Sequence, residues 1–188
     1  ILYRSNAQSR VLEEALIIRQ IPYRIYGGLR FFERAEIKDA LAYLRILSSR
    51  TDDAAAERII NVPPRGIGNK TIAILRSHAR QSNLSLWDTA TALINSSELT
   101  KRAKTALANF IDLINEMDAD SNDFSLHQKT QLLIHQSGLM EHYLKEKGEK
   151  AEARKENLEE LINATREFED AEIEGDLSPL DAFLGHAA

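Results

Sequence analysis

Residues 63–71 read Pro63-Pro64-Arg65-Gly66-Ile67-Gly68-Asn69-Lys70-Thr71, and this stretch separates two segments that carry helical patterns. The prolines end the first segment, because proline cannot continue a helix. The glycines allow positive φ angles and a close approach of another backbone. A helical pattern opens again at Asn69, with Ile72, Leu75 and Ala79 on one face. A short glycine-containing turn between two helices is typical of a helix-hairpin-helix unit, which we therefore predict here.

The same turn has the chemistry of an anion site. The first N–H groups of the second helix have no partner inside it, and they carry the positive end of the helix dipole. A phosphate group suits such a position, and the candidate DNA-binding residues of the turn are Arg65, Gly66, Ile67, Gly68, Lys70 and Thr71. Within this set we expect Ile67 to anchor the turn by packing. The nine residues alone also fit a purely structural turn, so both interpretations stay open.

Charge is distributed unevenly along the 188 residues. The net charge is −5, yet residues 1–110 carry 17 Lys and Arg against 10 Asp and Glu, whereas residues 111–188 carry 7 against 19. The basic half can meet phosphates while the acidic half faces water or a basic partner. The absence of cysteine excludes disulfides and thiolate metal sites. No apolar run approaches the roughly 20 residues of a membrane span, so we expect no membrane partner.

The first 26 residues predict a strand, a helix and a strand. Residues 1–3 and 23–26 are short and apolar or aromatic, and between them Val11, Leu12, Ala15 and Leu16 share one helical face, with Asn6 or Ser5 as its cap. Two strands cannot bury their faces, so we expect this βαβ piece to be incomplete and the chain to be a piece of a longer one. We assign Tyr23, Tyr26, Phe31 and Phe32 to a core rather than to base stacking.

From residue 31 onward the patterns are helical throughout, so the fold class is mainly α. One apolar stripe comprises Ile37, Ala40, Leu41 and Leu44, and the clearest comprises Leu107, Phe110, Ile111, Ile114 and Met117. We expect Arg34, Lys38 and Arg45 on a solvated face. Caps are predicted at Thr51, at Ser85 with Asp88, at Ser125 with Gln128, and at Ser178 followed by Pro179. The polar residues 48–53 are a candidate hinge.

Three stretches together resemble the UvrD/PcrA/Rep group of superfamily-one DNA helicases, and its UvrD members most. They are the segment from Ile1 to Arg10, the segment from Tyr23 through Gly27-Gly28 and Phe31-Phe32-Glu33-Arg34 to Arg45, and Pro64-Arg65-Gly66-Ile67-Gly68. The resemblance extends through Glu156-Asn157-Leu158-Glu159-Glu160-Leu161 to the final segment 180–187. It implies that residues 1–48 are part of the second RecA-like motor domain (2A) and that residues 49–188 are the helical 2B subdomain inserted into it.

The resemblance also implies the activity of a parent protein. That activity is ATP-driven 3′-to-5′ unwinding of DNA in repair or replication, with ATP and Mg²⁺ as cofactors, in a cytoplasmic enzyme. The chain itself contains no G-x-x-x-x-G-K-[ST] phosphate loop and none of the family's acidic or later arginine motifs. We therefore expect no catalytic residue, no metal ligand and no ATPase activity here. The expected role is to grip DNA and, by rotation about residues 48–53, to regulate unwinding.

The resemblance places two further residues near the single-stranded DNA track, Arg4 and Asn6. An arginine after a strand can hold a phosphate, and an asparagine can bond a base or backbone. Expected partners are double- and single-stranded DNA, the other motor domains of the parent and DNA-repair proteins. Two other interpretations remain, a stand-alone helix-hairpin-helix DNA-binding module and a helical protein-interaction module.

Overall fold

A computed structural model describes all of residues 1–188 except 2, 4–5, 24, 26–29, 147 and 171–176, and the side chains of Asn6 and Asp170. The fold is mainly helical, as predicted. The α-helices are α1 Ser9–Ile18, α2 Ala35–Ser48, α3 Asp53–Ile59, α4 Asn69–Ser82, α5 Leu86–Ile94, α6 Lys101–Asp120, α7 Leu126–Gln136, α8 Leu139–Leu144, α9 Glu149–Asp170 and α10 Pro179–His186. Short 3₁₀ turns, η1 Asn6–Gln8 and η2 Phe31–Glu33, precede α1 and α2.

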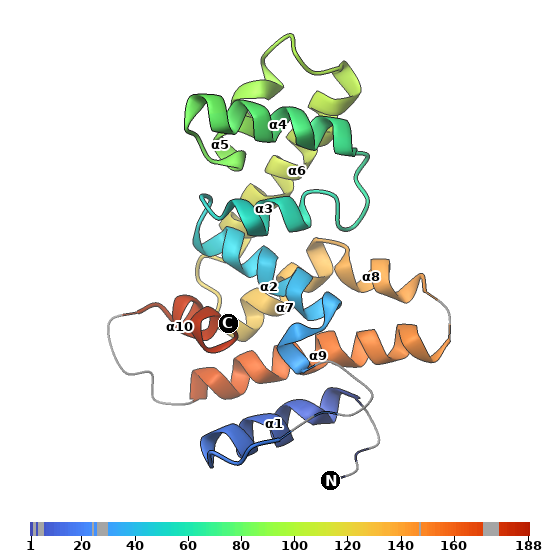
Figure 1. Cartoon of the computed structure of the whole chain (residues 1–188), viewed down its shortest axis with the longest axis vertical. Helices are drawn as coiled ribbons and strands as arrows, with labels where there is room; N and C mark the ends of the chain where they lie inside the picture. Colours follow the sequence, from blue (N-terminus) through green and yellow to red (C-terminus); the bar gives the residue numbers. More distant parts are fainter. Residues whose placement is uncertain (2, 4–5, 24, 26–29, 147, 171–176) are drawn as a thin grey trace.

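The molecule is elongated, with α4 and α5 at one end and α1 and α9 at the other (Figure 1). The 20-residue α6 runs from the first end toward α7. Helix α2 lies between the two ends and packs against α3, α7, α8, α9 and α10. Its predicted stripe of Ile37, Ala40, Leu41 and Leu44 is buried. The α6 stripe from Leu107 to Met117 is also buried, which confirms both periodic patterns.

Most of the predicted caps form. The Ser85 hydroxyl accepts from the amide of Asp88 at 3.0 Å, Ser125 and Gln128 make a capping box, and Ser178 caps α10 with Pro179 in its first turn. At α3 the prediction was wrong by one residue. Asp52, not Thr51, accepts from the Ala55 amide at 2.9 Å, because the cap must lie three residues before that amide.

The predicted strands find no counterpart among the described residues. Residues 1, 3, 23 and 25 have no regular structure, and residues 2, 24 and 26 lie outside the described part of the chain. Asn6 begins η1 rather than capping α1, and Ser5 is not described. The aromatic assignment is confirmed for Phe31, which is buried, and for Phe32, which packs against the core, whereas Tyr23 is half-buried and not among the core residues, and Tyr26 is not described.

Helix α1 buries polar residues that the apolar pattern did not predict, whereas Leu12, Ala15 and Leu16 of the predicted apolar face are only half-buried. Its buried residues are Ser9, Arg10 and Glu13, whereas Val11 is 53% exposed and Ile18 is 80% exposed. The reason is the chemistry of α9, which offers carboxylates to this side of α1. Arg34 is likewise buried rather than solvated, and its guanidinium donates to Asn157 Oδ1 at 2.7 Å and to Ser9. Among the described residues, no helix is long and apolar enough to cross a membrane.

Candidate nucleic-acid interface

The connection between α3 and α4 forms a tight, irregular turn over residues 60–68. Gly66 has φ +79°, a left-handed conformation that favours glycine. Gly68 has φ −84° and ψ 168°, which any residue adopts, and it occupies the position before the first residue of α4. The space around the Cα atoms of both glycines is open. The turn therefore needs glycine at 66 for its backbone, whereas position 68 accepts a side chain.

Asn61 organises the turn from its beginning. Its Oδ1 accepts from the backbone N–H of Arg65 at 2.7 Å and from that of Ile67 at 3.3 Å. Ile67 is completely buried, as expected for a packing anchor. The Tyr43 hydroxyl of α2 donates to the Val62 carbonyl at 2.6 Å. The backbone of the turn is thus held by one side chain of its own and by one from the central helix.

The Arg65 side chain points into the protein. Its Nη1 donates to the carbonyls of Ile59 and Pro63, at 3.2 and 3.0 Å. Its Nη2 donates to the Tyr43 hydroxyl at 2.5 Å and to the Ser137 carbonyl at 2.9 Å. The guanidinium also lies over the rings of Tyr43 and Phe110. Burial raises the pKa of Tyr43 to about 12, although the Arg65 charge opposes that rise.

The outward side of the turn presents backbone donors. The amides of Thr71 and Ile72 both donate to the Gly68 carbonyl, at 2.9 and 3.2 Å. The amides of Gly66, Gly68, Asn69 and Lys70 have no acceptor within the described part of the chain. They lie at the positive end of the α4 dipole, beside the exposed Lys70 and the half-buried Thr71. Such a group of N–H donors can bind an anion.

The structure brings together only part of the predicted set. Residues 65–71 form one site, with Arg65 and Ile67 turned inward and Lys70 exposed. Asn6 belongs to η1, which packs on α9 at the opposite end of the molecule from α4 (Figure 1), and its side chain is not described. Arg4 lies outside the described residues. The two groups of candidates therefore occupy separate places.

Sequence reasoning missed the residues that shape the turn from outside it. Tyr43 comes from α2, and Ser137 follows α7, so neither is near residues 63–71 in sequence. Asn61 had a weak local signal, since asparagine side chains near turns commonly accept hydrogen bonds from nearby backbone N–H groups. In the described residues, no group of three or more His, Cys, Asp and Glu side chains could hold a metal ion.

Comparison with known proteins places these features in a family. The family model described as "UvrD-like helicase C-terminal domain" matches residues 1–188. DNA helicase II of Escherichia coli (strain K12) and that of Haemophilus influenzae are each 54% identical to the whole chain. ATP-dependent DNA helicase PcrA of Staphylococcus aureus (strain Mu50) is 36% identical over 170 residues, 90% of the chain.

The chain spans only about a quarter of the length of these relatives, 26% of both DNA helicase II proteins and 23% of PcrA. The matches to both DNA helicase II proteins cover the whole chain, so they include the α3–α4 turn and the segments around it. The chain therefore belongs to the UvrD-like helicase C-terminal domain family.

Proposed function

We propose that this chain is the DNA-gripping part of a UvrD-like helicase, and that it binds the phosphates of duplex DNA through the α3–α4 turn. The parent would be an ATP-dependent enzyme that unwinds DNA in the 3′-to-5′ direction, with ATP and Mg²⁺ bound outside this chain. The names of the relatives, DNA helicase II and ATP-dependent DNA helicase PcrA, support this assignment.

One observation carries the proposal: the outward amides of Gly66, Gly68, Asn69 and Lys70 have no acceptor in the described part of the chain. A phosphate oxygen could accept from several of them at once, and the exposed Lys70 would add a charge. The role of Arg65 in this proposal is to hold the turn, because its Nη1 and Nη2 already donate four hydrogen bonds inside the protein. Contacts of this kind do not depend on base sequence, and they weaken as salt rises.

Other parts of the assignment rest on the family relationship. We propose that residues 1–48 belong to motor domain 2A and residues 49–188 to subdomain 2B, and that Arg4 and Asn6 contact single-stranded DNA. Val11, Ile17 and Ile18 of α1 are exposed. A group of large exposed apolar side chains on one helix favours a contact with another domain, so it supports this assignment over a stand-alone module. Regulation would involve rotation about residues 48–53, with repair proteins as further partners in the cytoplasm.

The test is duplex binding by a pair of isosteric variants, Gly68→Asp and Gly68→Asn. Both side chains fit the open space at residue 68, and both are favourable N-caps, so folding should be retained in each. Only aspartate places a negative charge where the phosphate would lie. Fluorescence anisotropy of a labelled duplex should show at least about tenfold weaker binding for Gly68→Asp than for Gly68→Asn. Equal affinities would contradict the proposal, and circular dichroism would verify the fold.

A further inference from the structure

Helix α4 continues from the turn with a charge pattern unlike that of its neighbours. Its 14 residues include Lys70, Arg76 and Arg80, and none is Asp or Glu. Its exposed residues are Asn69, Lys70, Ala73, Arg76, Ser77, Arg80, Gln81 and Ser82. At about 100° per residue all of these except Ser82 share one face, and the side chains between the cations, Ala73 and Ser77, are short. This face, which we call the α4 face, is basic, and no large side chain stands between its cations.

The two arginines of the α4 face differ in their pairing. Arg76 makes a two-pronged ion pair with Glu57 of α3, in which Nε donates to Oε2 at 2.6 Å and Nη2 to Oε1. This hydrogen bonding lowers the pKa of Glu57. Arg80 lies one turn further along α4 and is exposed, and no carboxylate in the described part of the chain pairs with it. Arg80 is therefore an available cation, whereas Arg76 is largely neutralised.

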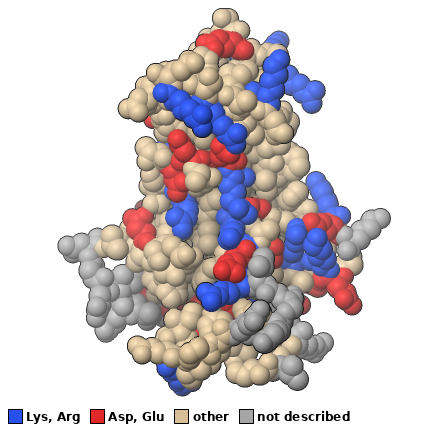
Figure 2. All heavy atoms as spheres, in the orientation of Figure 1, with Lys and Arg blue, Asp and Glu red and all other residues tan. Residues whose placement is uncertain are grey.

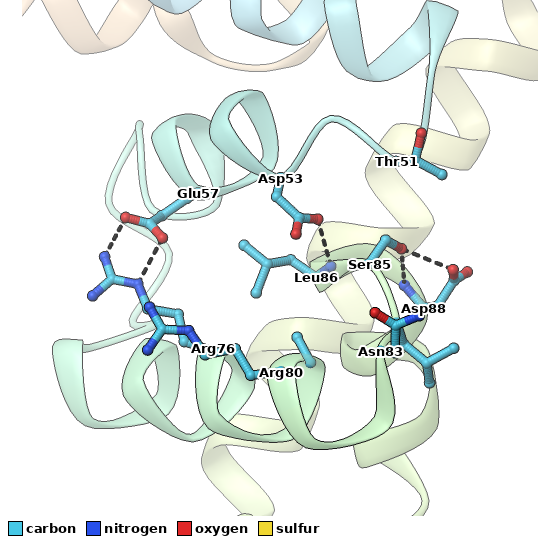
Figure 3. A pocket seen from close by; sticks show the side chains of 11 residues that line it. Thr51, Asp53, Glu57, Arg76, Arg80, Asn83, Ser85, Leu86 and Asp88 are labelled. Carbon is cyan, nitrogen blue, oxygen red and sulfur yellow. Dashed lines mark hydrogen bonds and ion pairs between the residues drawn. The ribbon is translucent and has the colours of Figure 1, made fainter.

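Both arginines border a groove of about 640 Å³ between α3, α4 and the start of α5 (Figure 3). The acids of the groove already have donors. Glu57 is paired with Arg76, Asp53 accepts from the Leu86 amide at 2.7 Å, and Asp88 accepts from the Ser85 hydroxyl at 2.8 Å. Figure 2 shows basic side chains over the end of the molecule that carries α4, with acidic groups below them and a further acidic group at the tip of the molecule. A polyanion would thus meet the α4 face rather than the groove.

We propose that the α4 face is a second contact surface for the duplex backbone, with Arg80 as its phosphate-binding residue. The inference rests on the proposed function, since the turn fixes one end of this surface. Lys70 and Arg80 are ten residues apart, so they lie about 15 Å apart along the helix axis. Duplex DNA presents one charge per about 1.7 Å of its axis, so a backbone held at the turn has phosphates within reach of Arg80. Because the α4 face is basic and a nucleic-acid backbone is negatively charged, we assign a nucleic acid as the partner of this face.

Three variants of the 188-residue chain test this surface, with a labelled blunt duplex in a salt series. Arg80→Gln keeps the length and helix propensity of the side chain and removes its charge. Its affinity at low salt should fall about two- to fivefold, and the slope of log K against log salt should shrink by about 0.9. Glu57→Gln releases Arg76 and should tighten binding by a similar factor. Arg166→Gln removes an exposed arginine from α9 and is the control, with no change expected.

The results of these binding experiments distinguish a failure of the α4-face inference from a failure of the proposed duplex binding by the turn. If Gly68→Asp abolishes binding while Arg80→Gln binds as the wild type does, the α4 face is not a contact surface and the turn alone binds. If Arg166→Gln weakens binding as much as Arg80→Gln, the effect reflects overall charge, and the inference is again wrong. If the wild-type chain does not bind duplex at any salt concentration, both the inference and the proposed function are contradicted.

Discussion

At the residue scale, Arg65 shows how a basic side chain in the turn that we propose to bind DNA can serve that turn indirectly. Its guanidinium joins the turn to Tyr43 of α2 and to the Ser137 carbonyl between α7 and α8. The planar fork of an arginine suits this, because it donates in several fixed directions at once. A lysine at the same position has one compact charge and could not reach all four acceptors. Arg65 therefore positions the amides that we propose to bind phosphate.

We expect Arg65→Lys to destabilise the fold although it keeps the charge. The change leaves buried acceptors without donors, which should lower the free energy of unfolding by about 2–3 kcal/mol. Urea unfolding followed by circular dichroism measures the change, and Arg80→Gln is the matched control, with an expected change within about 0.5 kcal/mol. If Arg65→Lys were as stable as the wild type but bound duplex poorly, Arg65 would be a phosphate ligand instead.

At this scale the sequence could predict features that depend on neighbouring residues, but not side-chain contacts between residues far apart along the chain. The left-handed conformation at Gly66 and the burial of Ile67 were predictable, because a proline pair, a tight turn and the start of a helix are local signals. The inward direction of Arg65 was not predictable, since its partners Tyr43 and Ser137 are 22 and 72 residues away. No periodic pattern carries information about such contacts.

At the scale of elements, the contact between α1 and α9 contains a cluster of charged side chains centred on the buried Arg10. The Arg10 side chain is 3% exposed and pairs with Glu14 at 2.9 Å and with Glu160 and Glu167 of α9 at 2.7 Å each. Burial alone would lower the pKa of Arg10, but the hydrogen bonds to Glu167 and Glu160 raise it above its ordinary value. This cluster fixes which side of α1 faces the bundle.

Removing the Arg10 charge should therefore release α1. In Arg10→Gln three carboxylates are left without their cation, and we expect a loss of about 2 kcal/mol, reduced from the fully buried case because Glu167 is 62% exposed. Hydrogen exchange should show α1 losing protection while α4 and α6 keep theirs. Arg19→Gln, at an exposed position just after α1, is the control. Unchanged protection in Arg10→Gln would mean that other contacts hold α1.

The same contact explains why helix positions were predictable but the orientation of α1 was not. In α2 and α6 the apolar stripe faces the core of this chain, so the periodic pattern identified the buried side. In α1 the most buried residues are polar, because complementary carboxylates lie on α9, while Leu12 and Leu16 are half-buried and Ile18 is exposed. A pattern of hydrophobicity reports a preference for burial, and it does not say which neighbour provides it.

At the scale of the whole molecule, the proposed duplex contacts and the contact with α1 lie at opposite ends (Figure 1). Between them, α2 packs against α3 and α9 and supplies Tyr43 to the turn. The division at residue 48 stays a prediction. At this point Ser48 hydrogen-bonds Asp181, and Arg50 pairs with Asp118 at 2.8 Å. The proposed rotation about residues 48–53 would have to break these bonds, so they are the contacts to measure in the proposed parent helicase.

The most direct test of the central claim is to observe the backbone amides of the turn while duplex DNA is added. In two-dimensional NMR spectra of the ¹⁵N-labelled chain, we expect the largest shift changes at Gly66, Gly68, Asn69 and Lys70, followed by the exposed face of α4. Added salt should reverse these changes, because phosphate contacts release counterions. If instead these four amides stayed unchanged while residues of α7 or α9 shifted, the turn would not be the phosphate site and the account would be wrong.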